Sequence, residues 1–327
     1  MGIHQAEVKM VGRAMSPYNV ELITPEEKDE IFNQNLHRYL YTKKANIYGC
    51  CIKLLTELEE IKDRWEENFY TMDENIRSHG RLIVLREQGG ELNVKYDPYT
   101  NTAFLTNVNY YGWVKSIALA VAGDVLEDEH GIYSVHGAAI DFGGTGVCII
   151  APSGTGKTTH SWGLLRHPEA RLISDDWFFV RLFDRGHQAF GSEKNCYIEA
   201  DIGKIWGEYL PLVERSHFDE KGRAVVNVRW IVGSGGVIPM TTIRKIILLK
   251  RDSSDERLVY RISPEEGLEY LLANDFCNPH QLVRDARKMS LRKNFFERLL
   301  EKSDVFIVNT VPPPAETHEN IIRVIKS

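Results

Sequence analysis

The stretch APSGTGKTTH, residues 151–160, constrains the fold more than any other part of the chain. Its small residues let backbone N–H groups turn inward around anionic oxygens, and the start of a following helix adds to the same anion site. The residues before it, CIIA, are typical of a strand, and HSWGLL after it is typical of a helix. This context predicts a P-loop. The alternative is a glycine-rich turn with no ligand.

Most residues of the loop have an expected role in nucleotide binding. Lys157 can reach the β- and γ-phosphates, and the Thr158 hydroxyl can ligate Mg²⁺. The expected nucleotide-binding residues are Ser153, Gly154, Thr155, Gly156, Lys157, Thr158 and Thr159. The usual P-loop pattern begins with glycine, where this chain has Ala151. We expect alanine to be tolerated there, because the residue ends a strand and needs only modest backbone torsions.

A second motif, RLISDDW at 171–177, is an apolar strand that ends in two acids. In a P-loop protein such a strand lies beside the loop and delivers an aspartate to the magnesium. We expect Asp175 to hold the metal and Asp176 to accept the proton of an attacking hydroxyl. The sequence leaves the order of these two roles open. The alternative is a helix cap or a surface pair.

The composition argues against several classes of protein. A net charge of −6 over 327 residues argues against a dedicated nucleic-acid binder, which would usually be basic. No apolar run approaches the length of about 18 residues that a membrane span needs, and no signal peptide is evident at the N-terminus. The five cysteines form no C-x-x-C pair, which favours free thiols. We therefore expect a cytoplasmic protein that binds neither nucleic acid nor membrane.

Strands and helices alternate along the chain, which predicts an α/β fold. We expect residues 1–106 to form an N-terminal arm, a helix and a small α+β subdomain, and residues 107–327 to form the P-loop domain. Strands are expected at 46–56, 81–87, 91–96, 102–108, 132–142, 146–151, 171–176, 186–192, 223–231, 243–250 and 304–310. Capping boxes at Thr24–Glu27 and Thr56–Glu59 predict helices at about 24–40 and after Thr56. Further helices are expected at 110–126, after the P-loop, at 263–274 as a helix capped by Ser263, at 283–301, and after Pro314.

Three segments together resemble the catalytic domain of HPr kinase/phosphorylase: SVHGAAID (134–141), APSGTGKTTH and LISDDW (172–177). That domain shares its nucleotide site with ATP-type phosphoenolpyruvate carboxykinase, and the likeness covers residues 107–195. The resemblance implies ATP as phosphoryl donor and Mg²⁺ as cofactor. It implies that Lys157 polarises the β- and γ-phosphates, that Thr158 and Asp175 hold Mg²⁺, that Asp176 activates the acceptor hydroxyl, and that His136 lies close to the transferred phosphate.

The chain departs from this family after the acidic strand. HPr kinases carry a glycine-rich signature there, with a Glu and an Arg, linked to phosphorolysis and to HPr docking. This chain reads AFGSEKNCYIEADIG at 189–203, in which Glu193 and Lys194 are the candidate replacements. We therefore expect an acceptor other than HPr, on a protein or peptide serine or on a small metabolite, and expect Glu193 and Lys194 to meet it.

Other interpretations remain open at this point. A carboxykinase-like enzyme on an oxo acid would need extra arginines, for which Arg223, Arg229 and Arg244 are candidates. A nucleotide-gated binding protein would not need Asp176 or His136. The glycine-rich stretch 232–237 is expected to be a mobile loop or a hairpin turn, which beside an active site could act as a lid, and the alternative is a second phosphate site. His280, Arg284 and Arg287 are interpreted as polar residues at a helix start, with contact to an acidic substrate as alternative. Two roles stay open for the first 105 residues, which are binding of the acceptor and an oligomer contact.

Overall fold

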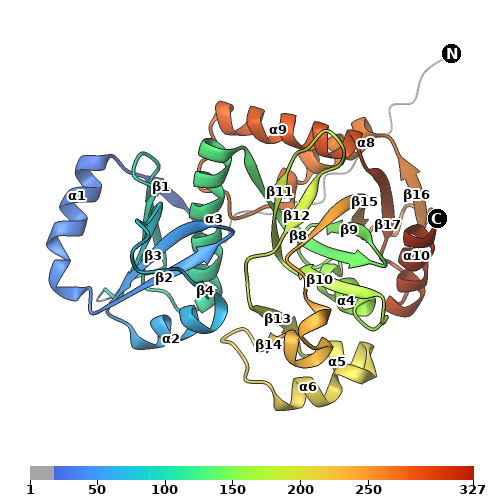
Figure 1. Ribbon diagram of the computed structural model, residues 1–327, viewed down its shortest axis with the longest axis horizontal. Coiled ribbons are helices and arrows are strands. Elements are labelled where there is room, and N and C mark those ends of the chain that lie inside the picture. The colour runs from blue at the N-terminus through green and yellow to red at the C-terminus, as the bar shows by residue number, and fades with distance from the viewer. Residues whose placement is uncertain (1–17, 88) are drawn as a thin grey trace.

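The computed structural model describes residues 18–87 and 89–327 and has an α/β fold (Figure 1). One mixed sheet has seven strands, in the order β1-β6-β7-β5-β3-β2-β4, and a second has eight. Helix α3 (Tyr111–His130) packs on β3 and β5 of the first sheet and on β8 of the second. It lies between the two sheets in Figure 1 and is buried along most of its length.

The first sheet is formed entirely by residues before α3. Its strands are β1 (Val20–Leu22), β2 (Tyr41–Ile47), β3 (Cys50–Thr56), β4 (Tyr70–Thr71), β5 (Gly80–Leu85), β6 (Asn93–Asp97) and β7 (Thr102–Thr106). Two helices accompany it, α1 (Pro25–Gln34) and α2 (Glu59–Asn68). The capping box at Thr24 and Glu27 is confirmed, but α1 ends six residues before the expected Leu40, because the chain turns there into β2.

Two predictions in this part are wrong. The single strand expected at 46–56 is a hairpin of β2 and β3, which turns at Tyr48 and Gly49 with φ of 50° and 80°. The capping box expected at Thr56 does not form. The Thr56 hydroxyl instead donates to the Val84 carbonyl at 2.7 Å and accepts from the Leu58 N–H at 3.1 Å. Leu58 is therefore the N-cap residue, and α2 begins at Glu59.

The second sheet carries the phosphate loop. Its strands are β8 (Ile132–Phe142), β9 (Thr145–Ile150), β10 (Ala170–Ser174), β11 (Trp177–Arg181), β12 (Gln188–Phe190), β15 (Met240–Lys250), β16 (Val259–Ile262) and β17 (Asp304–Asn309). Strand β9 pairs with β8 and β15. Strand β17, the last strand along the chain, lies between β15 and β16 and so is not at an edge of the sheet. A separate hairpin pairs β13 (Asn195–Glu199) with β14 (Arg223–Asn227).

Strand β8 has different neighbours before and after the position that later forms the site. Along one edge it pairs with β11 at residues 132–136 and with β10 at residues 139–142, and along its other edge it pairs with β9 at residues 137–142. Asp175 and Asp176 occupy the gap between β10 and β11, and the Asp176 carbonyl accepts from the Gly137 N–H at 2.9 Å. A Cβ at Gly137 would lie 2.8 Å from the Ile149 carbonyl oxygen, so the close approach of β9 to β8 at this position requires glycine.

The remaining helices cover the second sheet and its hairpin. They are α4 (Lys157–Leu164), α5 (Ile202–Ile205), α6 (Leu210–Arg215), α7 (Arg229–Val232), α8 (Pro264–Ala273), α9 (Ala286–Glu301) and α10 (Pro314–Lys326). The strand expected at 223–231 ends at Asn227, and α7 follows it. The glycine-rich stretch 232–237 contains a 3₁₀ turn at Ser234–Gly236. Helix α9 begins at Ala286 rather than 283, because the Asp285 side chain caps it.

All five cysteines lie in the described part of the chain, where each is buried and unbridged. Across residues 18–87 and 89–327, no helix combines the length and the apolar character that crossing a bilayer requires.

Candidate active site

The phosphate loop, residues 151–156, connects β9 to the first residue of α4, Lys157. Gly154 and Gly156 have φ of 79° and 98°, a region that favours glycine. The Thr155 hydroxyl donates to the Pro152 carbonyl at 2.7 Å and closes the loop. No side chain of the described residues caps α4 at its N-terminus, so its first N–H groups remain available to an anion. Ala151 is fully buried in the core, which explains why an alanine serves there.

Three of the predicted site residues meet beside this loop. The Lys157 ammonium lies 3.1 Å from Asp176 Oδ1 and 3.3 Å from His136 Nε2. His136 Nε2 is also 3.3 Å from Asp176 Oδ1. They come from three elements, since Lys157 begins α4, His136 lies on β8 and Asp176 follows β10. Strand β8 pairs with β9, which leads into the phosphate loop, and with β10 and β11, which flank Asp176, so residues that are separate in the sequence meet here.

The imidazole of His136 is held in one orientation by the backbone. Its Nδ1 donates to the Cys277 carbonyl at 2.6 Å, which leaves Nε2 as the acceptor facing Lys157. Burial, and then the charge of Lys157, lower the pKa of His136, so the ring is neutral at pH 7. The Cys277 carbonyl is presented by a turn in which Asp275, Phe276 and Cys277 all have φ between 51° and 54°. Such residues cost about 1–3 kcal/mol each and often mark functional sites.

The two adjacent acids have different environments. The Asp176 side chain keeps 37% of its surface exposed, whereas Asp175 is buried. Burial raises the pKa of Asp176, but the charges of Lys115 and Lys157 outweigh this effect and hold that pKa well below its usual range. Burial, and then the charge of Asp176, raise the pKa of Asp175 to about 6. Asp176 is thus ionised and accessible, whereas the positive charge around Asp175 is too small to offset the effect of burial on its carboxyl group.

Lys115, which lies near the start of α3, is a further residue of the site that the motifs did not indicate. Its ammonium is 2.9 Å from Asp176 Oδ2 and 3.2 Å from Glu193 Oε1. Burial lowers the pKa of Lys115, but the two carboxylates overcome this and raise it well above its ordinary value. Glu193 is also buried, and its pKa is raised to about 7 despite the nearby ammonium. A lone lysine within the apolar first part of the helix, residues 111–123, was the available signal.

His280, which was interpreted as a polar residue at a helix start, lies at the site. Its ring centroid is 5.9 Å from that of His136 and 6.0 Å from Trp177. The Tyr18 hydroxyl is 2.9 Å from His280 Nδ1, and Trp113 packs edge-on against Tyr18. Burial lowers the pKa of His280 to about 3, so its ring is neutral. Together these rings form an aromatic wall beside His136.

The other predicted substrate contacts lie elsewhere. Within the described residues, no hydrogen bond or ion pair joins the following side chains to Lys157 or Asp176: Lys194, Arg223, Arg229, Arg244, Arg284 and Arg287. Lys194 donates to the Glu66 carbonyl at 2.5 Å, and Arg223 pairs with Asp219 at 2.9 Å. The expected contact of Glu193 and Lys194 with an acceptor stays a prediction. Glu193 has in addition the internal contact with Lys115.

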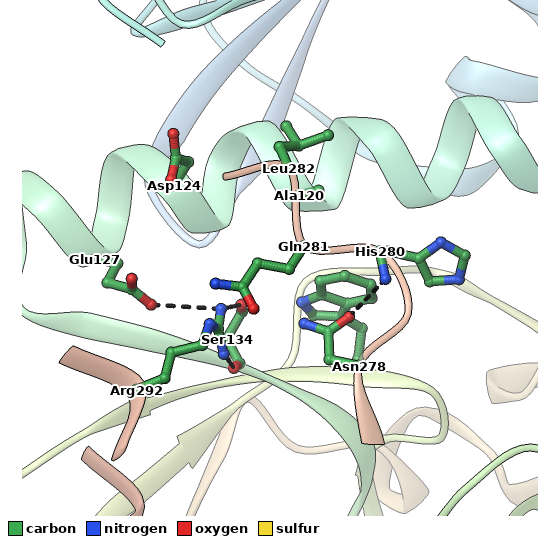
Figure 2. A pocket seen from close by; sticks show the side chains of 10 residues that line it. Ala120, Asp124, Glu127, Ser134, Asn278, His280, Gln281, Leu282 and Arg292 are labelled. Carbon is green, nitrogen blue, oxygen red and sulfur yellow. Dashed lines mark hydrogen bonds and ion pairs between the residues drawn. The ribbon is translucent and has the colours of Figure 1, made fainter. Parts of the chain in front are cut away.

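A cavity of about 10 Å³ adjoins the aromatic wall (Figure 2). Trp177 and His280 line one part of it, and Asp124, Glu127 and Arg292 line another. Arg292 lies 3.3 Å from Glu127 and donates to the Ser134 hydroxyl at 3.0 Å, which fills this region with paired charges. The cavity has room for about one water molecule. It is therefore too small to be an acceptor site.

Part of the chain is similar in sequence to two bacterial proteins that are named HPr kinase/phosphorylases. The chain is 28% identical over 159 residues to "HPr kinase/phosphorylase 1" of Oceanobacillus iheyensis, which covers 48% of this chain and 44% of that protein. It is 26% identical over 124 residues to "HPr kinase/phosphorylase" of Latilactobacillus sakei, which covers 38% and 34%. No family model matches the chain. The chain spans less than half the length of either relative. These similarities agree with the resemblance of the motifs, and the chain is therefore related to the HPr kinase/phosphorylases.

Proposed function

We propose that the protein is a kinase that uses ATP and Mg²⁺ to phosphorylate a hydroxyl group. The observation that carries this proposal is the group of Lys157, Asp176 and His136, which lie within 3.3 Å of one another beside the phosphate loop. Phosphoryl transfer depends mainly on positioning and on neutralising charge. A loop of backbone N–H groups, one lysine and one ionised carboxylate supply these requirements.

The nucleotide binds with its phosphates in the loop of residues 151–156. The N–H groups at the start of α4 face the phosphates, and Lys157 moves from Asp176 to the β- and γ-phosphate oxygens. The negative charge of the phosphates replaces the charge of Asp176 as the partner of Lys157. Asp176 is thereby released for the acceptor.

The residues present fit a magnesium ion that arrives with the nucleotide. Mg²⁺ binds oxygen ligands and usually takes one or two carboxylates together with substrate phosphates. Asp175 and the Thr158 hydroxyl supply such oxygens. The raised pKa of Asp175 marks a buried carboxylate with too little positive charge nearby, which a divalent cation would correct. Bound there, Mg²⁺ would neutralise charge that develops on the phosphates.

The reaction follows from the position of Asp176. The acceptor oxygen attacks the γ-phosphorus, a new P–O bond forms, and the bond between the γ-phosphorus and the β–γ bridging oxygen breaks to release ADP. The proton of the hydroxyl passes to Asp176. Neutral His136, held by the Cys277 carbonyl, lies beside the same carboxylate oxygen and orients the reacting groups.

The acceptor is a hydroxyl of a protein or peptide serine, or of a small metabolite. The relatives are named for phosphorylating HPr, a protein, so HPr belongs among the acceptors to be tested. The stretch 189–203 lacks the glycine-rich signature that the resemblance would require for HPr. We therefore favour a different acceptor.

A screen of acceptors with ATP labelled at the γ-phosphate tests the proposal. Purified protein, MgATP and each of HPr, serine peptides, free serine, other small alcohols and a cell extract would be incubated, with the Lys157→Ala variant as control. We expect a labelled phosphate ester with the wild type that the variant does not form. Binding of MgATP without transfer to any acceptor would instead favour a nucleotide-gated binding protein. A wild type that neither binds MgATP nor transfers phosphate would refute the proposal.

A further inference from the structure

We propose that Lys115 is a positioning residue of the kinase site, and that Glu193 and Asn68 hold it in place, so that the part of the chain before α3 completes the site. This inference rests on the proposed phosphotransfer function. It adds a role for the first sheet and α2, to which the motifs assign none.

The first step is the geometry around the Lys115 ammonium. It lies 2.9 Å from Asp176 Oδ2 and 3.2 Å from Glu193 Oε1, with the Tyr197 ring 5.1 Å away. The side chains of Lys115 and Glu193 are 5% and 6% exposed. A buried ammonium is strongly unfavourable unless carboxylates and hydrogen bonds compensate it. The position of Lys115 is therefore fixed by these two acids.

The second step concerns the two oxygens of Asp176. Lys115 contacts Oδ2, whereas Lys157 and His136 both contact Oδ1. When Lys157 turns to the phosphates, Oδ1 becomes free to accept the proton of the acceptor. Lys115 does not move to the phosphates as Lys157 does, because it lies on the buried helix α3 and is paired with Glu193. It therefore stays on Oδ2 and keeps Oδ1 directed at the reaction.

The third step concerns what holds Glu193. Asn68, the last residue of α2, donates from its side-chain amide to Glu193 Oε1 at 3.2 Å. The Asn68 carbonyl accepts from the Lys194 N–H at 2.8 Å, and Phe69 forms a β-bridge with Glu193. Asn68 is fully buried. The end of α2 thus fixes the backbone and the side chain of the residue that holds Lys115.

Three variants test this chain of contacts: Lys115→Met, Glu193→Gln and Asn68→Ala. We expect the affinity for MgATP, measured by calorimetry, to change by less than about threefold in each, whereas Lys115→Met lowers phosphoryl transfer by about 10²-fold, within the range of general-base effects. Glu193→Gln and Asn68→Ala should lower transfer by smaller factors, because they act through Lys115. The probe is γ-labelled MgATP, with water and the acceptor found in the screen as phosphoryl acceptors.

Glu220→Gln is the matched control, because it makes the same chemical change at the same interface. Glu220 pairs with Arg64 of α2, and its side chain is 39% exposed and makes no contact with Lys115. We expect full transfer activity from this variant. A loss equal to that of Glu193→Gln would mean that loosening the interface, rather than releasing Lys115, lowers activity, and would overturn the proposal.

A double-mutant comparison separates positioning from general destabilisation. In an Asp176→Asn background, Lys115→Met should lower transfer no further, because its effect passes through Asp176. If Lys115→Met does not fold, Glu193→Gln in the same background gives the same test. Additive losses would overturn the role of Lys115. Failure of the wild type to bind MgATP or transfer phosphate would refute the proposed function itself, whereas a fully active Lys115→Met would refute only this inference.

Discussion

Asp176 contacts different cations with its two carboxylate oxygens, and this division organises the site. Oδ1 faces Lys157 and His136, and Oδ2 faces Lys115. Two of these groups have fixed positions, since His136 is bound to the Cys277 carbonyl and Lys115 to Glu193. Lys157 alone among the three lies at the start of the phosphate loop helix, so it is the group that a nucleotide would draw away.

Removal of the Lys157 side chain should weaken nucleotide use. The Lys157→Ala variant loses the cation that binds the β- and γ-phosphates, so MgATP affinity or turnover should fall at least tenfold, about 1.4 kcal/mol. The fold should survive, because the residue lies at the edge of the core. Calorimetry and a turnover assay measure the two effects. Unchanged affinity together with unchanged turnover would contradict a phosphate-binding role for the loop.

The buried acids make the nucleotide-free protein sensitive to pH. The pKa values of Asp175 and Glu193 are raised to about 6 and about 7, so the folded state binds more protons than the unfolded state above about pH 4. Stability contributed by these groups therefore falls as the pH rises from about 4 to 7. Asp175→Asn and Glu193→Gln should reduce this loss relative to the wild type. Urea denaturation at pH 5 and pH 8 measures the change in the free energy of unfolding for each protein. A wild type whose free energy of unfolding rises more toward pH 8 than that of either variant would contradict this prediction.

At the scale of elements, a buried ionic cluster joins α9 to α3. The Lys288 ammonium on α9 is 2.6 Å from Asp124 and 2.8 Å from Asp128, both on α3, and Arg292 one turn later reaches Glu127. Figure 2 shows Arg292 directed at Glu127 and Ser134. This cluster fixes α3, which carries Lys115, against the second sheet.

Breaking the cluster should destabilise the fold strongly. Lys288→Met removes the ammonium that faces Asp124, whose side chain is only 10% exposed, and an uncompensated buried carboxylate costs about 3–5 kcal/mol. Lys293→Met on the same helix is the control, because its side chain is 51% exposed, and it should change stability by no more than about 0.5 kcal/mol. Urea denaturation of both variants measures the difference. Equal midpoints for the two variants would show that the cluster does not stabilise the fold.

The sequence predicted elements where a local signal determines them. The capping boxes at Thr24 and Ser263 and the strand, loop and helix around 151–160 all form as expected. The hairpin at Tyr48 was missed, because a tyrosine at φ of 50° gives no turn signal in the sequence. Thr56 resembles a helix cap, but the neighbouring strand β5 supplies a competing carbonyl. That competition depends on tertiary structure, which local patterns do not contain.

The same division holds for the site. His136, Lys157 and Asp176 could be predicted, because each lies in a motif whose spacing carries its chemistry. Lys115 and Asn68 could not, because contacts between distant segments of the chain bring them to the site, and His280 was interpreted first as a polar residue at a helix start. The contact of Glu193 with an acceptor stays a prediction, and its buried contact with Lys115 could not be read from the sequence.

At the scale of the whole molecule, the first sheet and the kinase-like part meet at the site. The boundary expected near residue 107 stays a prediction, but β1 to β7 all precede α3 and form one sheet. The end of α2 reaches Glu193, so the part of the chain that resembles no named module contributes to the site. A role for this part in binding the acceptor or a second copy of the chain also stays a prediction.

The acceptor should reflect the absent signature at 189–203. We expect no phosphorylation of purified HPr, and no release of pyrophosphate when a phosphoserine protein is incubated with inorganic phosphate, because the segment linked to both activities in the resembling family is missing. Mass spectrometry of HPr and a pyrophosphate assay measure the two outcomes. Efficient phosphorylation of HPr would show that a different surface of this chain recognises it.

The most direct test of the account is the effect of Asp176→Asn on phosphoryl transfer at saturating MgATP. The variant keeps the size of the side chain but cannot accept a proton, so transfer should fall by a factor of about 10² or more while the affinity for MgATP stays close to that of the wild type. Asp175→Asn, measured beside it, should instead raise the magnesium concentration needed for activity. An exchange of the two results would mean only that the acids have the opposite roles. Equal and small effects of both changes would contradict a kinase that uses this pair.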